Sequence, residues 1–586
     1  SQNSLITGFY MDHLSTDVLV VGAGAAGMYA SVSAAKSGAE VILCDKSLIS
    51  RGGATVMAQM TVAAAIGHQE ADHWTHHLYD TIQSGQGLCN EKLSYQLCKK
   101  APDKILEMRD WKTGWANDNA RIRQVLAPGH KIKRCCYVDF LNTGPAVART
   151  LRGEVAKHKN IQRISGITII DLVIKNARVA GAIGLNTETG DFVSFAAKAV
   201  VLAAGGLTQL FARNSASKNM GGDSHALALR AGANLIDMEF VQFFPIGHLA
   251  PRLVGMDPIM WDPFRYKLGG KLLNGQGKQF IENYGGEDGA TYTVGRDLAA
   301  YAILKECEAG RGSPNGGAWL SFQHLKKEEL EGAFGPIIKK LAFNDIDLTK
   351  QSIEVAPIAH YHMGGIEVDE SMETCVKGLF AAGECVGGAN GANRLSGNAI
   401  PEAFVFGDIA GSNAARVKAS QNTLSNQDFE IAISHAMGDL LQPPSDNTLP
   451  QKQTSRGLLH ALQVIMWENV GVLRDTKKLQ KALTEITRLR NKVFPSIRPK
   501  QGTAFNTSLM DWLDTRNSLS CAEAICLAAS KRKESRGAHQ MEDIPVKSDK
   551  FTKNQIISER NGFLVSNWKA VQKLDFDLEV KSLEVK

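Results

Sequence analysis

The sequence predicts an α/β fold that begins with a Rossmann-like βαβ unit, and three observations support this prediction. Residues 17–21 (DVLVV) form an apolar run that is typical of a buried parallel strand, and they lead into the GxGxxG pattern of residues 22–27 (GAGAAG). A helix of small residues is expected to follow. A second apolar strand, residues 40–44 (EVILC), then ends in Asp45, at the distance that a dinucleotide-binding unit requires.

The glycines and the aspartate of this unit each suit one part of a bound dinucleotide. Gly22 permits the tight turn, Gly24 lets the backbone approach a pyrophosphate, and Gly27 lets the helix pack on the strand. The N-terminus of the helix offers N–H donors to the phosphates, and Asp45 would accept hydrogen bonds from the adenosine ribose. We therefore expect a bound dinucleotide. The alternative is a glycine-rich helix start without a ligand.

Composition excludes several classes of protein. With 586 residues the chain is long enough for several structural units, and 44% apolar with 22% charged residues is ordinary for a globular protein. The chain has 66 Lys and Arg residues and 60 Asp and Glu residues, which gives a small net charge of +6. The basic residues form no long run, so nucleic acid is not an expected partner.

The cysteines and histidines do not predict a metal site. The ten cysteines include no CxxC pair, so we expect neither a zinc ribbon nor an iron–sulfur cluster in this chain. The segment HWTHH holds His73, His76 and His77, and we interpret it as a solvated helix face.

The chain contains no apolar stretch long enough to cross a membrane. The best run, residues 196–207, is interrupted by Lys198 and by a pair of glycines, and the N-terminal segment lacks the features of an export signal. We expect a cytoplasmic protein that reaches a membrane only indirectly, through partner subunits.

Two later segments repeat the pattern of a strand followed by glycines. Residues 198–204 (KAVVLAA) precede Gly205 and Gly206, and residues 378–382 (GLFAA) precede Gly383 and Glu384. The nucleotide-binding domain is therefore expected to be assembled from separated stretches of the chain.

With these motifs the sequence resembles the fumarate reductase/succinate dehydrogenase flavoprotein superfamily, which also includes L-aspartate oxidase. The resembling segments run in family order from about residue 15 to 545. They are GAGAAG, SRGGATVMAQ, AKAVVLAAGG, GGDSHALALRAGANLIDMEFVQFFP, IAHYHMGGI, GLFAAGECVGGANGANRLSGN, LQVIMWENVGVLRD and RKESRGAHQMED.

The resemblance implies a Rossmann-like FAD-binding domain, interrupted by an α+β capping domain and followed by a C-terminal helical domain. The FAD-binding domain is expected at residues 12–239 and 353–420, and the capping domain, which covers the substrate, at 240–352. A polar linker ends near residue 455. The helical domain is expected at 456–550, with a helix at 517–531, and residues 551–586 are expected to form a charged tail of weak pattern that wraps a subunit surface.

The cofactor implied by the resemblance is FAD. The expected contact residues are Gly22, Gly24, Ala25, Ala26, Gly27, Asp45, Lys46, Gly52, Gly53, Ala54, Thr55, Ala204, Gly205, Asp223, Gly383, Glu384, Arg394, Asn398, Ala399 and Ile400. Glu384 is expected near the ribitol, and residues 398–400 beside the isoalloxazine ring. Many respiratory members carry a flavin-linked histidine at the position of Ala54. FAD is therefore expected to bind noncovalently, which in this family generally accompanies a reductive or oxidase role.

The resemblance also implies the catalytic residues. Arg394 and His360 match the two positions that clamp one substrate carboxylate, a task for which the planar fork of arginine is suited. Arg296 matches the arginine thought to protonate the substrate carbon. Because arginine is a poor acid, this role requires a relay that reprotonates it, and a salt bridge to Asp297 is the alternative.

The far end of the expected substrate site departs from the family. Phe244 and Asn390 stand where the family has histidines, and Asp262, Pro263 and Tyr266 align with its Thr-Glu pair and relay arginine. The expected substrate-pocket residues are Phe244, Trp261, Phe264, Arg265, Tyr266 and Asn390, of which Arg265, together with Lys267, could restore a positive charge. Apolar residues in place of a carboxylate clamp favour a substrate with one carboxylate or carbonyl and a less polar remainder.

The sequence thus predicts an FAD-dependent oxidoreductase that transfers hydride to or from an activated carbon–carbon bond. We expect it to reduce an unsaturated acid or carbonyl compound other than fumarate, with electrons supplied through an iron–sulfur partner subunit. Two alternatives stay open at this point. One is an amino-acid oxidase of the L-aspartate oxidase type, and the other is an electron-relay flavoprotein subunit without a small-molecule substrate.

Overall fold

The computed structural model describes most of the chain. The described residues are 11–49, 52–55, 58, 61–139, 141–256, 259–261, 264–265, 268–284, 298–419, 424–441, 453–500 and 504–583. Several residues singled out in the sequence lie outside these ranges, namely Asp262, Pro263, Tyr266, Lys267, Arg296 and Asp297.

The largest sheet carries the nucleotide-binding motif. Its strands are β1 (Met11–Val21), β2 (Val41–Asp45), β8 (Ile161–Ser165), β9 (Ile167–Lys175), β10 (Arg178–Asn186), β11 (Phe192–Leu202) and β18 (Leu379–Ala381). Their order is β8-β2-β1-β11-β10-β9, with β18 also paired to β11. Strand β1 runs parallel to β2 and β11, and Val18, Leu19 and Val20 are fully buried, as a central strand of a parallel sheet requires.

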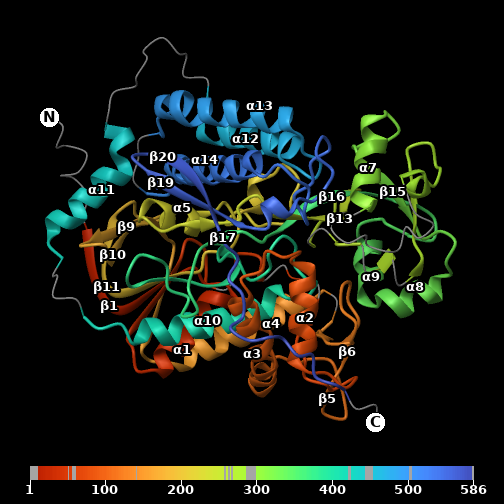
Figure 1. The fold of residues 1–586 in the computed structure, drawn as a ribbon, viewed down its shortest axis with the longest axis horizontal. Coiled ribbons are helices and arrows are strands. Elements are labelled where there is room, and N and C mark those ends of the chain that lie inside the picture. Colours follow the sequence, from red (N-terminus) through yellow and green to blue (C-terminus); the bar gives the residue numbers. More distant parts are fainter. Residues whose placement is uncertain are drawn as a thin grey trace.

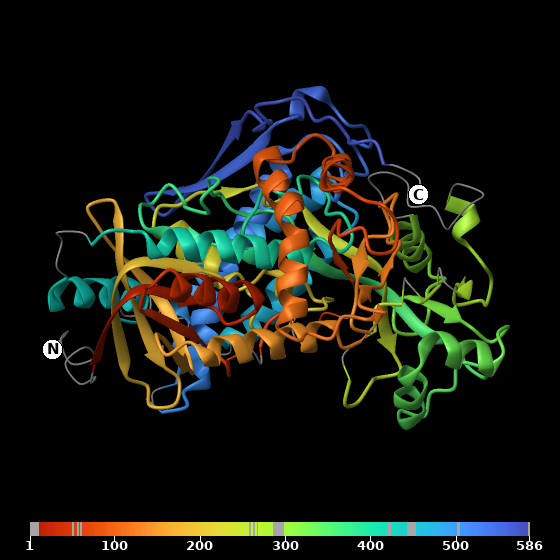
Figure 2. The same ribbon diagram turned by 90° about the horizontal axis from the view of Figure 1, so that it is seen from below.

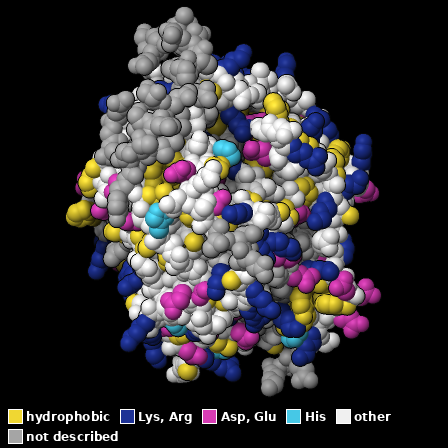
Figure 3. Space-filling model, turned by 90° about the vertical axis from the view of Figure 1, so that its left-hand side faces the viewer, with side chains coloured by type: hydrophobic (Ala, Val, Ile, Leu, Met, Phe, Trp, Pro, Cys, Tyr) yellow, Lys and Arg dark blue, Asp and Glu magenta, His cyan; other side chains and the backbone are white. Residues whose placement is uncertain are grey.

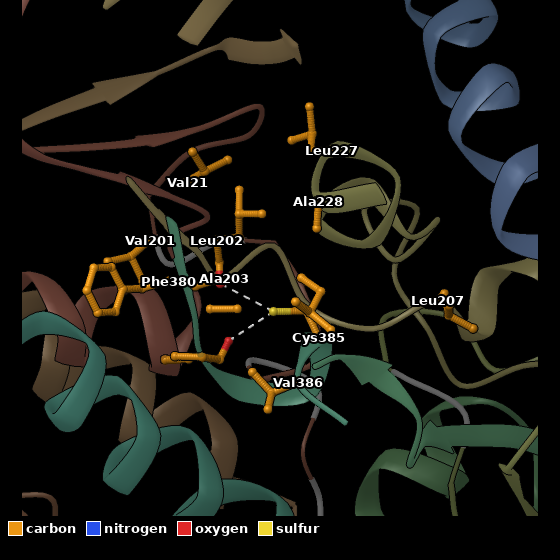
Figure 4. Close-up of a cluster of buried hydrophobic side chains, with 14 of the residues drawn as sticks. Val21, Val201, Leu202, Ala203, Leu207, Leu227, Ala228, Phe380, Cys385 and Val386 are labelled. Carbon is orange, nitrogen blue, oxygen red and sulfur yellow. Dashed lines mark hydrogen bonds between the residues drawn. The ribbon is translucent and has the colours of Figure 1, made fainter. Parts of the chain in front are cut away.

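The return of the chain to this sheet late in the sequence creates a shared apolar core. Phe380 of β18 is paired with Val201 of β11, and both lie in a buried apolar cluster that also includes Leu227 of α5 (Asp223–Arg230) (Figure 4). The Cys385 thiol lies 3.3 Å from the Leu202 carbonyl oxygen, a contact between segments 183 positions apart. The expectation of a domain assembled from separated stretches therefore has a direct packing basis.

Helices cover one face of the sheet through small residues. They are α1 (Ala25–Lys36), α2 (Trp74–Ser84), α3 (Glu91–Asp110), α4 (Thr143–Lys157) and α10 (Ala399–Ala415). Helices α1 and α10 lie side by side in both ribbon views (Figures 1 and 2). A Cβ atom added at Gly411 would lie 2.1 Å from the Ala30 carbonyl oxygen, and one at Gly407 would lie 2.7 Å from that of Ala26. Glycine is required here because the two backbones touch.

Short strands also form two small sheets, of order β3-β7-β6 and β4-β5. Near α2 and α4 they are β3 (Val62–Ala63), β4 (Asn117–Asp118), β5 (Arg121–Ile122), β6 (Gln124–Val125) and β7 (Cys135–Cys136). Single turns of 3₁₀ helix follow β11 at Thr208–Leu210 and β18 at Gly383–Cys385.

A second unit projects from one end of the molecule (Figures 1 and 2). Its sheet has the order β13-β16-β15-β14, formed by β13 (Val241–Ala250), β14 (Lys271–Leu273), β15 (Ala318–Ser321) and β16 (Ile353–His362). Around it lie α7 (Leu298–Glu308), α8 (Lys327–Phe334), α9 (Pro336–Phe343) and a 3₁₀ turn at Ile281–Tyr284. This capping unit has its own hydrophobic core, in which Trp261, Phe264, Phe322 and Phe334 are buried.

The helical part of the chain packs above the large sheet in the view of Figure 1. Its helices are α11 (Asn426–Leu441), α12 (Ser455–Asn469), α13 (Thr476–Arg488) and α14 (Thr507–Lys531), with a π turn at Leu489–Val493 and a 3₁₀ turn at Phe494–Ser496. Helix α14 begins ten residues before the predicted start at 517, because the Asn506 side chain caps it by accepting a hydrogen bond from the Leu509 N–H.

The C-terminal segment is more ordered than the sequence predicted. After a 3₁₀ turn at Asp549–Phe551, β19 (Asn554–Arg560) and β20 (Phe563–Lys569) form a hairpin in a sheet of order β17-β12-β19-β20, with β12 (Leu235–Ile236) and β17 (Gly365–Ile366). Residues 571–583, here called the strap, then run along α2 and α3 (Figure 1). The Glu91 N–H donates to the Gln572 carbonyl oxygen, and the Lys581 N–H donates to Thr75 Oγ1. The prediction of a tail of weak pattern was therefore wrong for residues 554–569.

Charged side chains of both signs lie on the surface. On the face shown in Figure 3, Lys and Arg side chains are interspersed with Asp and Glu side chains. Within the described ranges, no helix has both the length and the apolar character needed to span a bilayer.

The contact between α1 and α10 gives a test of the fold. We expect Gly411→Ala to lower the free energy of unfolding by several kcal/mol, because the new methyl group would overlap the Ala30 carbonyl oxygen. The control is Gly153→Ala on α4, where an added Cβ meets no atom within 4 Å. That change should stabilise the protein by about 0.5–1 kcal/mol. Urea unfolding compares the two variants, and equal effects would contradict close packing at Gly411.

Candidate dinucleotide site and adjoining chamber

One elongated cavity begins at the carboxyl ends of β1 and β2 and reaches the strands that enter the capping unit. Among the described residues it is lined by every predicted cofactor residue except Gly27 and Asn398. At the far end its lining includes Ser215, Phe244, Met260, His360, Tyr361 and Arg394. The glycine-rich cradle and the chamber at the far end are therefore parts of one continuous cavity.

The turn between β1 and α1 is built for close backbone contact. Gly22 has φ +106°, and a Cβ there would lie 2.2 Å from the Ala203 carbonyl oxygen. A Cβ at Gly27 would lie 1.8 Å from the Gly22 carbonyl oxygen, which explains why Gly27 packs behind the cavity. At Gly24, in contrast, the nearest atom to an added Cβ is Thr55 Oγ1 at 3.4 Å, so a side chain there would project into the cradle. This geometry suits a pyrophosphate at the N-terminus of α1.

Polar side chains surround the cradle at the end of β2. Asp45 accepts hydrogen bonds from the Ala23 N–H at 2.8 Å and from the Ser47 N–H at 3.0 Å. Lys46 lies 2.7 Å from an Asp223 carboxylate oxygen and 3.3 Å from one of Asp514 on α14. Burial disfavours the charge on Lys46, but the two carboxylates outweigh it and raise the pKa of Lys46. The helical part of the chain therefore completes this end of the site.

Glu384 lies between two glycine-rich segments. Its Oε1 atom accepts a hydrogen bond from the His362 N–H at 3.1 Å, and a Cβ at Gly206 would lie 2.4 Å from its carboxyl group. Burial raises the pKa of Glu384 to about 8, although the His362 N–H and Arg394 favour the charged form. At neutral pH this side chain can thus donate as well as accept hydrogen bonds.

Arg394 and His360 both line the chamber. Arg394 is 6% exposed, and its guanidinium lies 4.4 Å from the centroid of the Tyr361 ring. Its Nε atom has no hydrogen-bond partner among the described residues. Burial, together with the positive charge of Arg394, lowers the pKa of His360 to about 3, so the imidazole is neutral. Ser215 Oγ lies 3.0 Å from His360 Nδ1.

Phe244 supplies an apolar wall beside these two residues. Its ring meets the His360 ring edge to face, with the centroids 4.2 Å apart and the planes at 82°. Of the predicted pocket residues it is the one that lines the cavity within the described ranges, and Met260 lines the cavity beside it. Met260 was not predicted from the sequence.

Trp261 and Phe264 do not line this cavity. Trp261 is fully buried in the core of the capping unit, and its Nε1 donates to His248 Nδ1 at 3.1 Å. Phe264 packs against Phe334 in the same core, with the ring centroids 4.5 Å apart and the planes at 47°. Successive residues of an extended segment point to opposite sides, so when Met260 faces the cavity, Trp261 faces away from it. Arg265 is likewise not part of the lining.

Asn390 lies behind the chamber rather than in it. It is 1% exposed, and its Nδ2 donates to Glu402 Oε2 at 2.7 Å. The Tyr361 hydroxyl donates to the same oxygen at 3.0 Å. Burial raises the pKa of Glu402 to about 7. Asn390 therefore acts on the chamber through Glu402 and Tyr361, two residues that the sequence analysis did not single out.

Asn398 is also held behind the cavity. Its Oδ1 accepts from His77 Nε2 at 2.8 Å, and its Nδ2 donates to Thr81 Oγ1 at 3.1 Å. His77 is fully buried, so the prediction of a solvated face for HWTHH is wrong at this residue. His73 caps α2, and His76 Nε2 lies 2.7 Å from the Lys581 carbonyl oxygen of the strap. No group of three or more potential metal ligands occurs among the described residues.

Glu384 makes the stability of the apoprotein pH-dependent. Its pKa is about 8 when folded and near 4.5 when unfolded, so between these values the folded state retains a proton that the unfolded state loses. This group therefore reduces stability as the pH rises from about 5 to 8. We expect Glu384→Gln to remove this loss, worth a few kcal/mol at pH 8.5 and little at pH 5. Urea unfolding of the apoprotein at both pH values measures the difference in unfolding free energy between the variant and the wild type. The control is Glu430→Gln on the exposed side of α11. A difference that does not depend on pH would contradict the raised pKa of Glu384.

Comparison with known proteins agrees with this geometry. The family model described as "FAD binding domain" matches residues 17–400, and the one described as "Fumarate reductase flavoprotein C-term" matches residues 459–582. An uncharacterized FAD-dependent oxidoreductase of Methanocaldococcus jannaschii is 32% identical over 97% of this chain and 100% of its own length. One chain of the fumarate reductase (CoM/CoB) of Methanothermobacter marburgensis is 31% identical over 93% of this chain and 97% of its own.

Solved structures show the same relationship. The FrdA chain of a variant Escherichia coli quinol fumarate reductase superposes with a TM-score of 0.86 at 29% identity, covering 97% of this chain and 99% of that one. Mycobacterium smegmatis Sdh1 superposes with a TM-score of 0.87 at 32% identity, and the match covers 97% of this chain and 96% of that one. The match extends over the cofactor domain, the capping unit and the helical part. The chain therefore belongs to the family of fumarate reductase and succinate dehydrogenase flavoprotein subunits and is an FAD-dependent oxidoreductase.

Proposed function

We propose that this flavoprotein transfers hydride to or from an activated carbon–carbon bond and that it reduces an unsaturated acid or carbonyl compound other than fumarate. The observation that carries the proposal is the edge-to-face contact of Phe244 with His360, beside Arg394. A buried cation next to an apolar wall favours a substrate with a single anionic or carbonyl end.

The residues present fit FAD. The open cradle at Gly24, the N-terminus of α1 and the carboxyl group of Asp45 suit its diphosphate and ribose, and Glu384 suits a hydroxyl-rich chain. Ala399 and Ile400, at the start of α10, offer backbone N–H groups at the other end of the cavity. Bound FAD would supply the hydride chemistry.

The chamber residues have distinct tasks in this proposal. Arg394 binds a carboxylate or carbonyl oxygen of the substrate, and its burial strengthens this contact because little water screens it. When Ser215 donates to Nδ1, the neutral His360 carries its proton on Nε2 and can donate a second hydrogen bond. Phe244 and Met260 contact the less polar remainder of the substrate and exclude water from it. Arg296 is proposed as the proton donor to the substrate carbon, with Tyr266 as the next candidate.

Electrons are proposed to come from an iron–sulfur partner subunit, through which the protein would also reach a membrane. Relatives over most of the chain are named as subunits, among them the flavoprotein subunit of the Wolinella succinogenes 8-methylmenaquinol:fumarate reductase. Hydrogen peroxide release during turnover would instead favour an amino-acid oxidase. Rapid flavin reduction by a partner, without turnover of any small molecule, would favour an electron-relay subunit.

The attachment of FAD can be tested directly. We expect acid precipitation to leave all yellow colour in the supernatant, because Ala54 lines the cavity where a covalent link would need a histidine. The measurement is the absorbance of the supernatant and the fluorescence of the washed pellet. Flavin fluorescence that stays with the denatured polypeptide would contradict noncovalent binding.

Substrate choice provides the main test. A four-carbon dicarboxylate would place a carboxylate against Phe244, where it loses hydration without gaining a partner, at a cost of several kcal/mol. We therefore expect fumarate and succinate to be poor substrates, with kcat/KM lower by a factor of hundreds or more than for the preferred substrate. Reduction of fumarate with reduced viologen as the donor measures this.

A matched pair of variants tests whether Phe244 is the cause of the poor activity with fumarate. Phe244→His should recover part of the fumarate activity. The control is Phe243→His, because Phe243 packs on Phe211 and Trp467 and does not line the cavity. Efficient fumarate reduction by the unaltered protein would overturn the proposal.

A further inference from the structure

We propose that His130, held by Arg134, orients the peptide group between Ser396 and Gly397 so that the Gly397 N–H faces the cavity as a fixed hydrogen-bond donor. The donor would bind an acceptor oxygen, either on the flavin ring or on the substrate. This inference rests on the proposed position of the flavin at this end of the cavity, and it adds positioning residues to that site.

Arg134 is the buried anchor of the arrangement. It is fully buried, with its Nε 2.9 Å from Asp72 Oδ2 and its Nη1 2.7 Å from Asp80 Oδ2. Nη1 also donates to His130 Nδ1 at 2.9 Å. Two carboxylates thus fix the guanidinium, and the guanidinium in turn fixes the imidazole.

This contact determines the tautomer of His130. A guanidinium can only donate, so Nδ1 of His130 must accept and Nε2 must carry the proton. Burial lowers the pKa of His130 to about 4, which keeps the ring neutral at physiological pH. The Nε2–H group lies 2.6 Å from the Ser396 carbonyl oxygen and donates to it.

The planarity of the peptide group carries this constraint into the cavity. In a trans peptide the N–H points opposite to the C=O. Because the Ser396 carbonyl points to His130, the Gly397 N–H points the other way, and both residues line the cavity. Within the described part of the chain, no hydrogen-bond acceptor contacts this N–H. The Gly397 carbonyl is fixed as well, since it accepts from the Ala63 N–H at 2.8 Å.

A second histidine fixes the following residue. His77 donates to Asn398 Oδ1, and its ring centroid lies 6.0 Å from that of His130. Arg394, which clamps the substrate in the proposed function, stands two residues before Ser396. The same loop therefore carries the chamber arginine, the oriented N–H and the start of α10, and two buried histidines hold it from behind.

The test compares three substitutions at one position. In His130→Gln the amide oxygen can accept from Arg134 and the amide N–H can donate to Ser396, whereas His130→Leu makes neither bond. In His130→Asn the shorter amide cannot span both partners. The control is His248→Leu, because His248 has the same pattern, accepting from Trp261 and lying 2.5 Å from the Pro251 carbonyl oxygen, in the capping unit.

The readouts are the dissociation constant of FAD, the flavin midpoint potential without substrate, and KM for fumarate with reduced viologen. We expect His130→Leu to weaken FAD binding about tenfold and to make the potential more negative, with Gln near the wild-type values. Should KM alone shift and Gln restore it, the acceptor is a substrate oxygen. If the Leu variant does not fold, the comparison of the same readouts between His130→Asn and His130→Gln tests the inference. Unchanged affinity, potential and KM in the Leu and Asn variants would overturn the inference. Because FAD affinity and potential are measured without a substrate, this result is separate from the substrate proposal.

Discussion

Backbone packs directly against backbone where the turn between β1 and α1 crosses the end of β11, and the cavity is arranged around this contact. Gly22 touches Ala203, and Gly27 touches Gly22, with no side chain between them. The same close approach continues where Gly407 and Gly411 bring α10 against α1. Since α10 begins five residues after Arg394, the geometry of the chamber depends on Gly407 and Gly411, which do not line the cavity.

A buried charge network ties the helical part of the chain to the entrance of the capping unit. Arg532 and Arg536 both pair with Glu534 at 2.9 Å, and all three are almost fully buried. Arg474 donates to the Glu239 carbonyl oxygen at 2.7 Å, two residues before β13 enters the capping unit. Burying such charges is costly, and removing one partner leaves another charge uncompensated, so the network favours one arrangement of the connecting strands.

Motifs whose residues lie close together in the sequence could be predicted. The side to which a residue of a connecting segment points, and the partners that lie far away in the chain, could not. The predicted α/β architecture, the FAD cofactor and the family are confirmed. Arg394 and His360 both line one chamber, and their role as a clamp for a substrate carboxylate stays a prediction. Trp261 and Phe264 were misplaced because a large apolar residue suits the core of the capping unit and the wall of the cavity equally, and only the packing of this connecting segment decides between them.

Long-range hydrogen bonds explain the other differences between prediction and structure. The burial of His77 depends on Asn398, which is 321 positions away in the chain. The hairpin of β19 and β20 was hidden because its outer strand, β20, is exposed or half-exposed along its whole length, and the pairing of β19 with β12 leaves no trace in local composition. Arg296 and Tyr266 lie outside the described residues, so their roles stay predictions.

The strap has a consequence for how the protein is made. It crosses the outer side of α2, the helix whose inner side supplies His77 to the loop before α10. A ribosome adds about 5–20 residues per second, and domains begin to fold as they emerge. The βαβ unit at the N-terminus is therefore synthesised long before β18, α10 and the strap that complete its surroundings. Cofactor loading thus becomes a late event in biosynthesis, and the nascent chain must keep a glycine-lined cradle open and unaggregated until nearly all of the sequence has been translated.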